Sequence, residues 1–250
     1  MNPLASDLAA VLDPAAFSRG TGIEPDSWQV AVLRSAAPRI LLNCSRQSGK
    51  STTAATMGVW TALYEPGALV LLLSPTLRQS GELFRKALAV YRDAGRPVPP
   101  DSETALTLSL ENGSRIVSLP GKEGTIRGYS GVRLLVIDEA AWVPNDLYVS
   151  VRPMLAVSQG RLIALSTPHG NRGWWYEAWE RGGPDWERYR VPAEDCHRIS
   201  PAFLEEERRT LGEWWFGQEY QCSFLDALSG AFREADIQAA FGEAVEQWEL

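Results

Sequence analysis

The residues best suited to chemistry stand at positions 45–52, in the run Ser45-Arg46-Gln47-Ser48-Gly49-Lys50-Ser51-Thr52. Gly-Lys-Ser ends the phosphate-binding loop pattern, in which backbone N–H groups at a helix N-terminus hold phosphate oxygens. Lys50 is then expected to reach the β- and γ-phosphates, and the Ser51 hydroxyl to bind Mg²⁺. Cys44 replaces the first glycine of the pattern. The sequence therefore predicts a nucleoside triphosphate site formed by Ser45, Arg46, Gln47, Ser48, Gly49, Lys50, Ser51 and Thr52.

A second candidate group is a pair of acids, Asp138 and Glu139, that directly follows the apolar run Leu134 to Ile137. The carboxyl ends of parallel strands meet at one edge of a sheet, so this pair is expected beside the phosphate loop. Asp138 would hold Mg²⁺ together with Ser51, and Glu139 would orient and deprotonate the attacking water. Two acids at the end of a strand are also common in surface turns. Their place after a phosphate loop favours hydrolysis over binding alone.

Two further segments are expected near the same edge. The run Arg161 to Ser166 leads into Thr167 and Pro168, which brings small hydroxyl side chains there, although an ordinary turn would look the same. Upstream, Gln29 can offer both a donor and an acceptor to an adenine edge, whereas Trp28 is expected in the core.

The elements that must position these residues alternate in type. Nearly continuous apolar runs indicate strands buried on both faces, and helix-length segments between them suit parallel crossovers. The sequence therefore predicts a doubly wound, mostly parallel α/β sheet. Its expected strands are Ile40 to Asn43, Leu69 to Ser74, Leu134 to Ile137 and Leu162 to Ser166, and its expected helices are Lys50 to Tyr64, Thr76 to Ala94 and Asn145 to Val151.

An inserted β-hairpin and a helical C-terminal part complete the expected fold. Glu111-Asn112-Gly113 separates the strand-like runs Ala105 to Leu110 and Ser114 to Ser118, and Asn-Gly tolerates the positive φ of a tight turn. Prolines at 97, 99 and 100 interrupt regular secondary structure before the hairpin. The glycine-rich segment Pro120 to Gly131 after it is expected to be a mobile loop. A helix is expected from Pro201, with a solvated charged run at 205–209. The predicted divisions are an extension at 1–24, a core at 25–192 and a helical lid at 193–250.

Composition limits the classes of protein. The chain has 250 residues, 45% hydrophobic, enough for one large α/β domain. Its net charge of −7 argues against nonspecific nucleic-acid binding over the whole surface, but leaves room for a local basic face. The three cysteines form no C-x-x-C pair, so we expect reduced thiols and no zinc site. The first 25 residues suggest neither a secretory signal nor a membrane span, and a cytoplasmic protein is expected.

Several motifs, in order, resemble the ATPase domain of the large terminase subunit, the DNA-packaging motor of tailed bacteriophages. The resemblance covers about Pro25 to Phe241. An arginine inside the phosphate loop, as at Arg46, is typical of that family, and Gln29 is similar to its adenine-reading glutamine. The remaining similar motifs are Ile126-Arg127-Gly128, Leu135-Val136-Ile137-Asp138-Glu139-Ala140, Ser166-Thr167-Pro168 and Phe216-Gly217-Gln218-Glu219-Tyr220-Gln221-Cys222-Ser223-Phe224.

The resemblance implies a P-loop NTPase fold of the ASCE type, with ATP and Mg²⁺ as cofactors. Arg46 would sense the γ-phosphate, and Arg127, or failing that Arg133, would act as an arginine finger on a neighbouring subunit. The implied catalytic set is Glu139, Lys50, Arg46 and Arg127, and the implied coupling residues are Ser166, Thr167 and Pro168. The implied partners are double-stranded DNA, a portal protein, a small terminase subunit and further copies in a homo-oligomeric ring, in the host cytoplasm and without a membrane.

One departure from the family concerns the nuclease. Large terminases usually continue into an RNase H-like nuclease domain, whereas this sequence stops at Leu250. Asp226, Glu234 and Asp236 are present, but they have no room to form that fold. The nuclease is therefore expected either as a separate chain or in a longer protein of which this is the ATPase part, and we expect no DNA cleavage by this chain.

Candidate DNA-contacting residues have an alternative interpretation in each case. The rings of Trp174, Trp175, Tyr176, Trp179 and Trp186 could stack on bases, but helical spacing favours side-chain packing. Arg85, Lys86, Arg92 and Arg96 could contact a DNA backbone, but a solvated helix face is the more common explanation.

Two other functions compete with the motor ATPase. A helicase-like, nucleic-acid-stimulated ATPase would require a second lobe, for which the chain is too short. A nucleotide-dependent assembly factor that does not hydrolyse ATP would have no need of Glu139.

Overall fold

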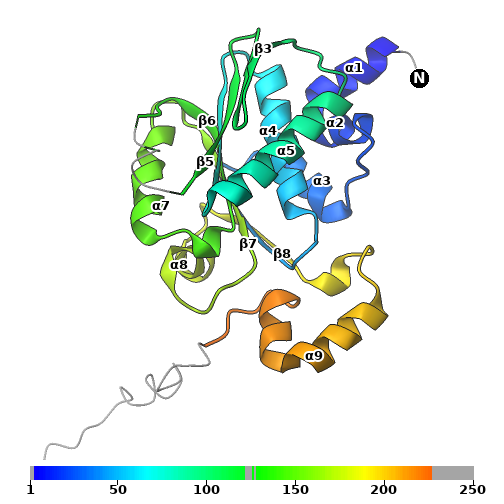
Figure 1. The fold of residues 1–250 in the computed structure, drawn as a ribbon, viewed down its shortest axis with the longest axis vertical. Helices are drawn as coiled ribbons and strands as arrows, with labels where there is room; N and C mark the ends of the chain where they lie inside the picture. The colour runs from blue at the N-terminus through cyan, green and yellow to red at the C-terminus, as the bar shows by residue number, and fades with distance from the viewer. Residues whose placement is uncertain (1–2, 122–125, 127, 227–250) are drawn as a thin grey trace, which may run out of the picture.

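A computed structural model of the 250-residue chain describes residues 3–121, 126 and 128–226 (Figure 1). Its described strands form one eight-stranded sheet in the order β3-β4-β5-β2-β6-β7-β1-β8. The strands are β1 (Arg39–Cys44), β2 (Leu69–Ser74), β3 (Pro100–Glu103), β4 (Thr107–Leu110), β5 (Arg115–Pro120), β6 (Val132–Asp138), β7 (Arg161–Ser166) and β8 (Glu187–Val191).

Most neighbouring strands are parallel, as the alternation of strands and helices predicted. β1 pairs in parallel with β7 and β8, β2 with β5 and β6, and β6 with β7, whereas β3, β4 and β5 pair antiparallel. The predicted doubly wound, mostly parallel sheet is therefore confirmed.

Helices cover both faces of this sheet (Figure 1). Along β1, Ile40 and Leu42 point into one hydrophobic cluster, and Leu41 between them points into the other. This two-sided burial explains why the strands read as unbroken apolar runs. The first face carries α1 (Pro3–Leu12), α2 (Pro14–Gly20), α3 (Ser27–Arg34), α4 (Lys50–Tyr64) and α5 (Leu77–Asp93), and the second carries η1 (Ala140–Trp142), α7 (Asn145–Val151), η2 (Arg152–Leu155) and α8 (Gly173–Arg181).

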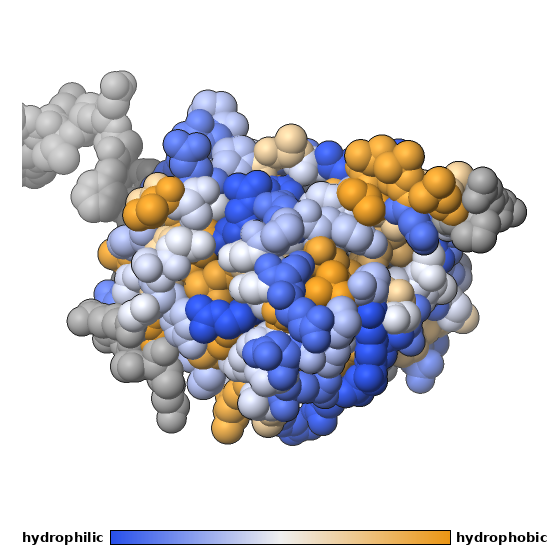
Figure 2. All heavy atoms as spheres, turned by 90° about the horizontal axis from the view of Figure 1, so that it is seen from above, coloured by the Kyte–Doolittle hydropathy of each residue, from blue (hydrophilic) through white to orange (hydrophobic). Residues whose placement is uncertain are grey.

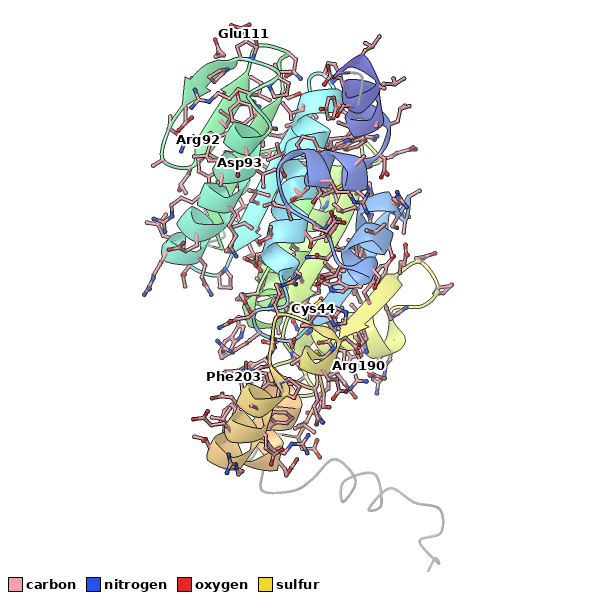
Figure 3. The ribbon with its side chains drawn as sticks, turned by 90° about the vertical axis from the view of Figure 1, so that its right-hand side faces the viewer. Cys44, Arg92, Asp93, Glu111, Arg190 and Phe203 are labelled. Carbon is pink, nitrogen blue, oxygen red and sulfur yellow. The ribbon has the colours of Figure 1, made fainter. Side chains whose placement is uncertain are left out.

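The chain continues from β8 into a segment that lies at the carboxyl ends of the parallel strands, which we call the α9 segment (residues 193–226). It contains η3 (Ala193–Asp195) and α9 (Pro201–Glu219). The Ser200 hydroxyl caps α9 by accepting from the backbone N–H of Phe203 at 3.2 Å, so the helix predicted from Pro201 is confirmed. Gly212 interrupts it with φ 77° and ψ 164°. Figure 3 shows Cys44, the last residue of β1, at the end of the sheet that faces the segment bearing Phe203.

The predicted hairpin is present as β4 and β5, but it is part of the main sheet. β5 pairs in parallel with β2, so the hairpin extends the sheet instead of standing apart from it. The proline-rich stretch before it, predicted as a break, begins the exposed edge strand β3 at Pro100. Proline has no N–H for the sheet, and the edge is where this is tolerated.

The N-terminal helices pack on the first face. Ala15 and Phe17 of α2 belong to the cluster that contains α4, and the indole N–H of Trp60 donates to the carbonyl of Ala10 at 2.9 Å. Helix α1 also exposes apolar side chains, among them Leu8 and Leu12, and Figure 2 shows an apolar patch at this end of the chain. None of the described helices is both long and apolar enough to cross a lipid bilayer.

Asn112, in the hairpin turn, closes the C-terminal end of α4. Its side-chain amide donates to the carbonyls of Ala62 and Leu63 at 2.9 and 3.2 Å, and its Oδ1 accepts from the N–H of Ser114 at 3.0 Å. Helix α4 begins at the phosphate loop, so this turn supports the far end of the element that carries Lys50.

We expect Asn112→Ala to lower the free energy of unfolding by about 1–2 kcal/mol, because two helix-terminal carbonyls lose their donor. Urea denaturation followed by circular dichroism would measure the loss. The neighbouring exposed residue Glu111 supplies the control, since Glu111→Ala should change stability by no more than about 0.5 kcal/mol. Equal stability of the two variants would contradict the role of Asn112.

Candidate nucleotide-binding site

The phosphate loop joins the end of β1 to the start of α4, as predicted. Gly49 adopts a left-handed conformation with φ 93°, and a Cβ at this position would lie 2.9 Å from Nε2 of Gln29. Both the conformation and the close approach require glycine. The loop therefore leads into the N-terminus of the 15-residue helix α4, where the first backbone N–H groups of a helix are suited to bind an anion.

Lys50 and two serines line this loop with polar atoms that are short of partners. Lys50 is 6% exposed, and its Nζ donates to the carbonyl of Ser45 at 3.3 Å. The hydroxyls of Ser45 and Ser48 are buried and have no hydrogen-bond partner among the described residues. Buried hydroxyls without partners are uncommon in native proteins, and a ligand with several acceptor oxygens would satisfy them.

Cys44, at the position of the missing glycine, is fully buried at the end of β1. Burial raises the pKa of its thiol well above the ordinary value, and the charge of Lys50 opposes that shift only in part. The thiol is therefore neutral near pH 7 and acts as a small packing group beneath the loop.

The acid pair lies across from the loop. Ser51 Oγ lies 3.4 Å from Oδ1 of Asp138, the last residue of β6, although these residues are 87 positions apart. Burial, followed by the charge of Glu139, raises the pKa of Asp138 to about 6. The predicted pairing of Ser51 with Asp138 in space is thus present in the structure.

Glu139 is held in an unusual backbone conformation next to Asp138. Its φ of 50° and ψ of 47° lie in the left-handed region, and its N–H donates to Asp138 Oδ1 at 3.0 Å. A residue other than glycine pays about 1 kcal/mol or more for this conformation, and such residues cluster at functional sites. This left-handed residue ends the line of β6 and begins the turn of η1.

The predicted coupling residues begin at Ser166, the last residue of β7, which lies between β6 and β1 in the sheet. Ser166 is fully buried, and its Oγ accepts from the N–H of Ala141 at 3.2 Å. Thr167 and Pro168 are buried beside it. Ser166 therefore connects the end of β7 to the turn that carries Glu139.

Gln29, the predicted adenine reader, has both amide atoms engaged with protein. Its Oε1 accepts from the N–H of Asp26 at 2.8 Å, and its Nε2 donates to Thr53 Oγ1 at 2.9 Å. The cavity beside it has a volume of about 10 Å³, enough for no more than a water molecule. Its contact with adenine stays a prediction. Trp28 packs against the hydrophobic cluster, as expected.

A larger cavity of about 310 Å³ lies between the phosphate loop and the α9 segment. Arg198 lines it without any sequence pattern to mark it. Its guanidinium donates to both carboxylate oxygens of Asp26, at 2.9 and 2.7 Å, and to the carbonyl of Ser48 at 2.9 Å. The other lining residues are Arg46, Gln47, Ile199, Ser200, Phe203 and Tyr220.

Two arginines were predicted as candidates for the arginine finger. Arg127, the predicted arginine finger, is outside the described residues. Arg133, the second candidate, forms an ion pair with Glu65 near the start of β6, at the opposite end of that strand from Asp138.

The aromatic and basic residues considered for DNA contact have other partners in several cases. Trp174 stacks on Tyr148 with ring centres 3.9 Å apart, and its indole N–H donates to the carbonyl of Val143 at 2.8 Å. Trp175 is buried in the same cluster, so side-chain packing of these two tryptophans is confirmed. On α5, Arg85 and Arg92 form ion pairs at the surface with Glu82 and Glu103 respectively.

Comparison with known proteins agrees with this arrangement. The family model described as "Terminase large subunit, T4likevirus-type, N-terminal" matches residues 41–239. The terminase large subunit of Thermus phage G20c is 26% identical over 253 residues, covering 86% of this chain and 52% of that protein. That of Escherichia phage T5 is 28% identical over 217 residues, covering 81% of this chain and 48% of that protein. The chain thus spans about half the length of these curated relatives.

Solved structures with a similar fold are also large terminase proteins. The large terminase ATPase domain of Thermus phage P74-26 superposes with a TM-score of 0.76 at 25% identity, covering 85% of this chain and 99% of that domain. The family model covers well over half of the sequence, and the fold agrees with it. This chain belongs to the terminase large subunit family.

Proposed function

We propose that this chain binds ATP with Mg²⁺ and hydrolyses it as the ATPase part of a DNA-packaging motor. The observation that carries the proposal is the position of Asp138 and Glu139 directly opposite a phosphate loop that contains a buried lysine. Binding alone would need only the loop. The name of the P74-26 structure, which calls that domain an ATPase, supports the proposal.

The triphosphate would be held by the start of α4. The backbone N–H groups of the loop and the hydroxyls of Ser45 and Ser48 would bond phosphate oxygens and so satisfy atoms that now lack partners. Lys50 would exchange its contact with the Ser45 carbonyl for the β- and γ-phosphates. The nearby cavity of about 310 Å³ offers room for the rest of the nucleotide.

Ser51 and Asp138 fit a Mg²⁺ ion. Magnesium prefers oxygen ligands and usually keeps several waters, so a hydroxyl and one carboxylate beside bound phosphates are sufficient. The Asp138 carboxylate is buried and forms no ion pair among the described residues, and this burial raises its pKa. A bound cation would supply the missing opposite charge. When bound, the ion would neutralise charge on the phosphates.

Glu139 and Arg46 supply the remaining chemistry. Glu139 would accept a proton from the attacking water, since it directly follows Asp138 at the edge of the sheet and its charge acts on Arg46 of the phosphate loop. Arg46 would contact the γ-phosphate and stabilise charge that develops on it during transfer. A movement of Glu139 during hydrolysis would be transmitted to the rest of the protein through Ser166, Thr167 and Pro168. Ser166 already accepts a hydrogen bond from the turn next to Glu139.

The proposed partners follow from the family. We infer that the protein translocates double-stranded DNA with a portal protein and a small terminase subunit, as a homo-oligomeric ring in the host cytoplasm. A ring would allow Arg127 to act on the site of a neighbouring subunit. A net charge of −7 argues against DNA contact over the whole surface of one chain and leaves room for a local basic face or a basic channel in an assembly.

Replacement of the loop lysine tests nucleotide binding. Lys50→Ala should weaken ATP binding at least about tenfold, because a buried charge-assisted contact with phosphate is lost. Isothermal titration calorimetry would measure the affinity. Arg85→Ala removes an exposed positive charge from α5 and should leave ATP affinity unchanged. Unchanged affinity in Lys50→Ala as well would refute the phosphate-loop assignment.

Replacement of the proposed base tests hydrolysis. Glu139→Gln should slow ATP turnover about 100-fold or more while ATP still binds, because the amide cannot accept the proton. Phosphate release would be followed under saturating ATP, with Glu177→Gln as an exposed control on α8. If Glu139→Gln turned over as fast as the parent, the role of Glu139 would be wrong.

The pH dependence of stability tests the environment of Asp138. The folded pKa of Asp138, about 6, lies above the ordinary value of 3.8 for this side chain, so the folded state retains the proton and loses stability as the pH rises between these values. Asp138→Asn removes this loss. In the absence of nucleotide and Mg²⁺, the variant should melt several degrees higher than the parent at about pH 8, with a smaller difference at about pH 5.

Thermal unfolding at the two pH values would show the difference directly. Asp93→Asn, at an exposed position on α5, should give the same small change at both. A variant at Asp138 that melts below the parent at the higher pH would contradict the buried-charge explanation.

A further inference from the structure

A cavity of about 660 Å³ lies on the second face of the sheet, at the opposite end of β1 from the phosphate loop. Arg39, the first residue of β1, lines it together with parts of α7, η2 and α8 and the turn before β8. Trp174, Ala178 and Trp186 add apolar side chains to the lining. The proposed hydrolysis of ATP uses none of these residues.

Two arginines in this cavity lack an opposite charge. The Arg152 guanidinium lies 5.7 Å from the ring centre of Tyr148, and that of Arg39 donates only to the carbonyls of Pro38 and Gly160, at 3.1 and 3.2 Å. Burial raises the pKa of Tyr148, and the charges of both arginines oppose this shift, so both act at the phenol. Among the described residues, neither guanidinium belongs to an ion pair.

Two carboxylates also line the cavity. Glu177 forms an ion pair with Arg181 at 3.4 Å, and Asp185 lies in the turn that follows α8. A nucleic-acid backbone carries a negative charge on every phosphate and would be repelled by these groups. A protein segment with apolar side chains and a single carboxylate suits the cavity better, because it can fill the apolar part and pair with Arg39 or Arg152.

Helix α1 carries such a segment. Leu8, Val11 and Leu12 are 57%, 40% and 73% exposed, and their spacing places them on one side of the helix. We call these three residues the α1 stripe; they belong to the apolar patch in Figure 2. Asp7, which is exposed, is the only charged residue of α1. Adjacent exposed apolar side chains mark an interaction surface.

The α1 stripe and the cavity lie on opposite sides of the sheet (Figure 1). Helix α1 packs on the first face, whereas α7 and α8 pack on the second, so the stripe cannot reach the cavity of its own chain. A contact between these two surfaces must therefore join two copies. Each copy contributes a different surface, and repeated contacts of this heterologous kind form a ring when their rotation closes.

We propose that the α1 stripe of one copy docks in the cavity of a second copy, with Asp7 close to Arg39 and Arg152. The stripe supplies apolar side chains to the tryptophan-lined part of the cavity, and Asp7 supplies the charge that both guanidiniums lack. This docking deepens the proposed function and rests on it for the role of a ring. The two surfaces are separate from the ATP site.

Disruption of each surface in turn tests the contact. The stripe variant, Leu8→Asp/Leu12→Asp, loses the apolar side chains, and the cavity variant, Arg39→Glu/Arg152→Glu, reverses the charge that Asp7 meets. Light scattering at increasing concentration should show the mass of the parent rising above that of one chain. Each variant alone should keep the mass of one chain.

A mixture of the two variants gives a result that is specific to a heterologous contact. The stripe variant keeps an intact cavity, and the cavity variant keeps an intact stripe. An equal mixture should therefore form pairs with the mass of two chains and nothing larger. A contact between identical surfaces would give no such pairs.

Exchange of the charges guards against a cavity variant that is merely misfolded. Asp7→Arg should weaken the association of the parent at least about tenfold, because like charges then meet. The same substitution in the cavity variant restores opposite charges and should recover part of the association. A misfolded cavity could not be rescued in this way.

Two substitutions outside both surfaces serve as controls. Leu77 is 63% exposed on α5, and Arg85 is exposed on the same helix. Leu77→Asp and Arg85→Glu introduce the same kinds of charge as the stripe and cavity variants, and both should associate like the parent.

Titration calorimetry separates the two proposals. ATP affinity should be equal in the parent, the stripe variant and the cavity variant, because neither surface includes the phosphate loop. A parent that binds no ATP would refute the proposed function, and the mass measurements would still decide the docking. A parent that keeps the mass of one chain at every concentration would overturn the docking and leave the ATP site intact.

Two further results would also overturn the docking. One is the absence of pairs in the mixture of variants when the parent associates. The other is a parent that binds a short DNA duplex while the cavity variant does not, which would assign the cavity to nucleic acid.

Discussion

Burial of both faces of the central strands is the constraint on which the rest of the structure depends. β1 shows it at the level of single residues, since Ile40 and Leu42 enter one hydrophobic cluster and Leu41 the other. A parallel sheet with both faces buried is connected by helices that cross over it. These crossovers bring the carboxyl ends of the parallel strands to a common edge. The ends of β1, β6 and β7 lie side by side there. The functional site is thus a consequence of how the apolar side chains are covered.

Features that depend on neighbouring residues could be predicted from the sequence. The helix from Lys50 to Tyr64, the hairpin around Asn112 and the two acids at the end of β6 each have a local pattern, and the structure contains all three. The contacts of Arg198 with the phosphate loop and of Glu219 with Arg46 have none, because they join residues 150 and 173 positions away in the sequence. Gln29 shows the opposite difficulty: its side chain suits a ligand, yet the start of α3 and Thr53 already occupy its amide.

Several features of the site lower the stability of the chain without nucleotide. Asp138 buries a carboxyl whose charged form is disfavoured, Glu139 has a left-handed backbone, and the hydroxyls of Ser45 and Ser48 lack partners among the described residues. A buried polar group left unsatisfied costs about 1–3 kcal/mol, which is considerable beside the net stability of about 5–15 kcal/mol of a typical domain. Burial of apolar side chains in the clusters on the two faces of the sheet stabilises the fold enough to offset this loss. Local strain can persist where the surrounding fold holds it in place, and here the strands on either side do so.

The three cysteines give the protein a property that is useful in the laboratory. Cys44, Cys196 and Cys222 are all buried, and burial raises the pKa of each thiol, that of Cys222 to about 12. Thiol reagents attack the thiolate at accessible sites, so these native groups should react slowly near neutral pH. A single cysteine placed on the surface of α9 or α5 would then be the reactive one. Fluorescent or spin labels can be attached to chosen helices without first removing the native sulfur atoms from beneath the phosphate loop.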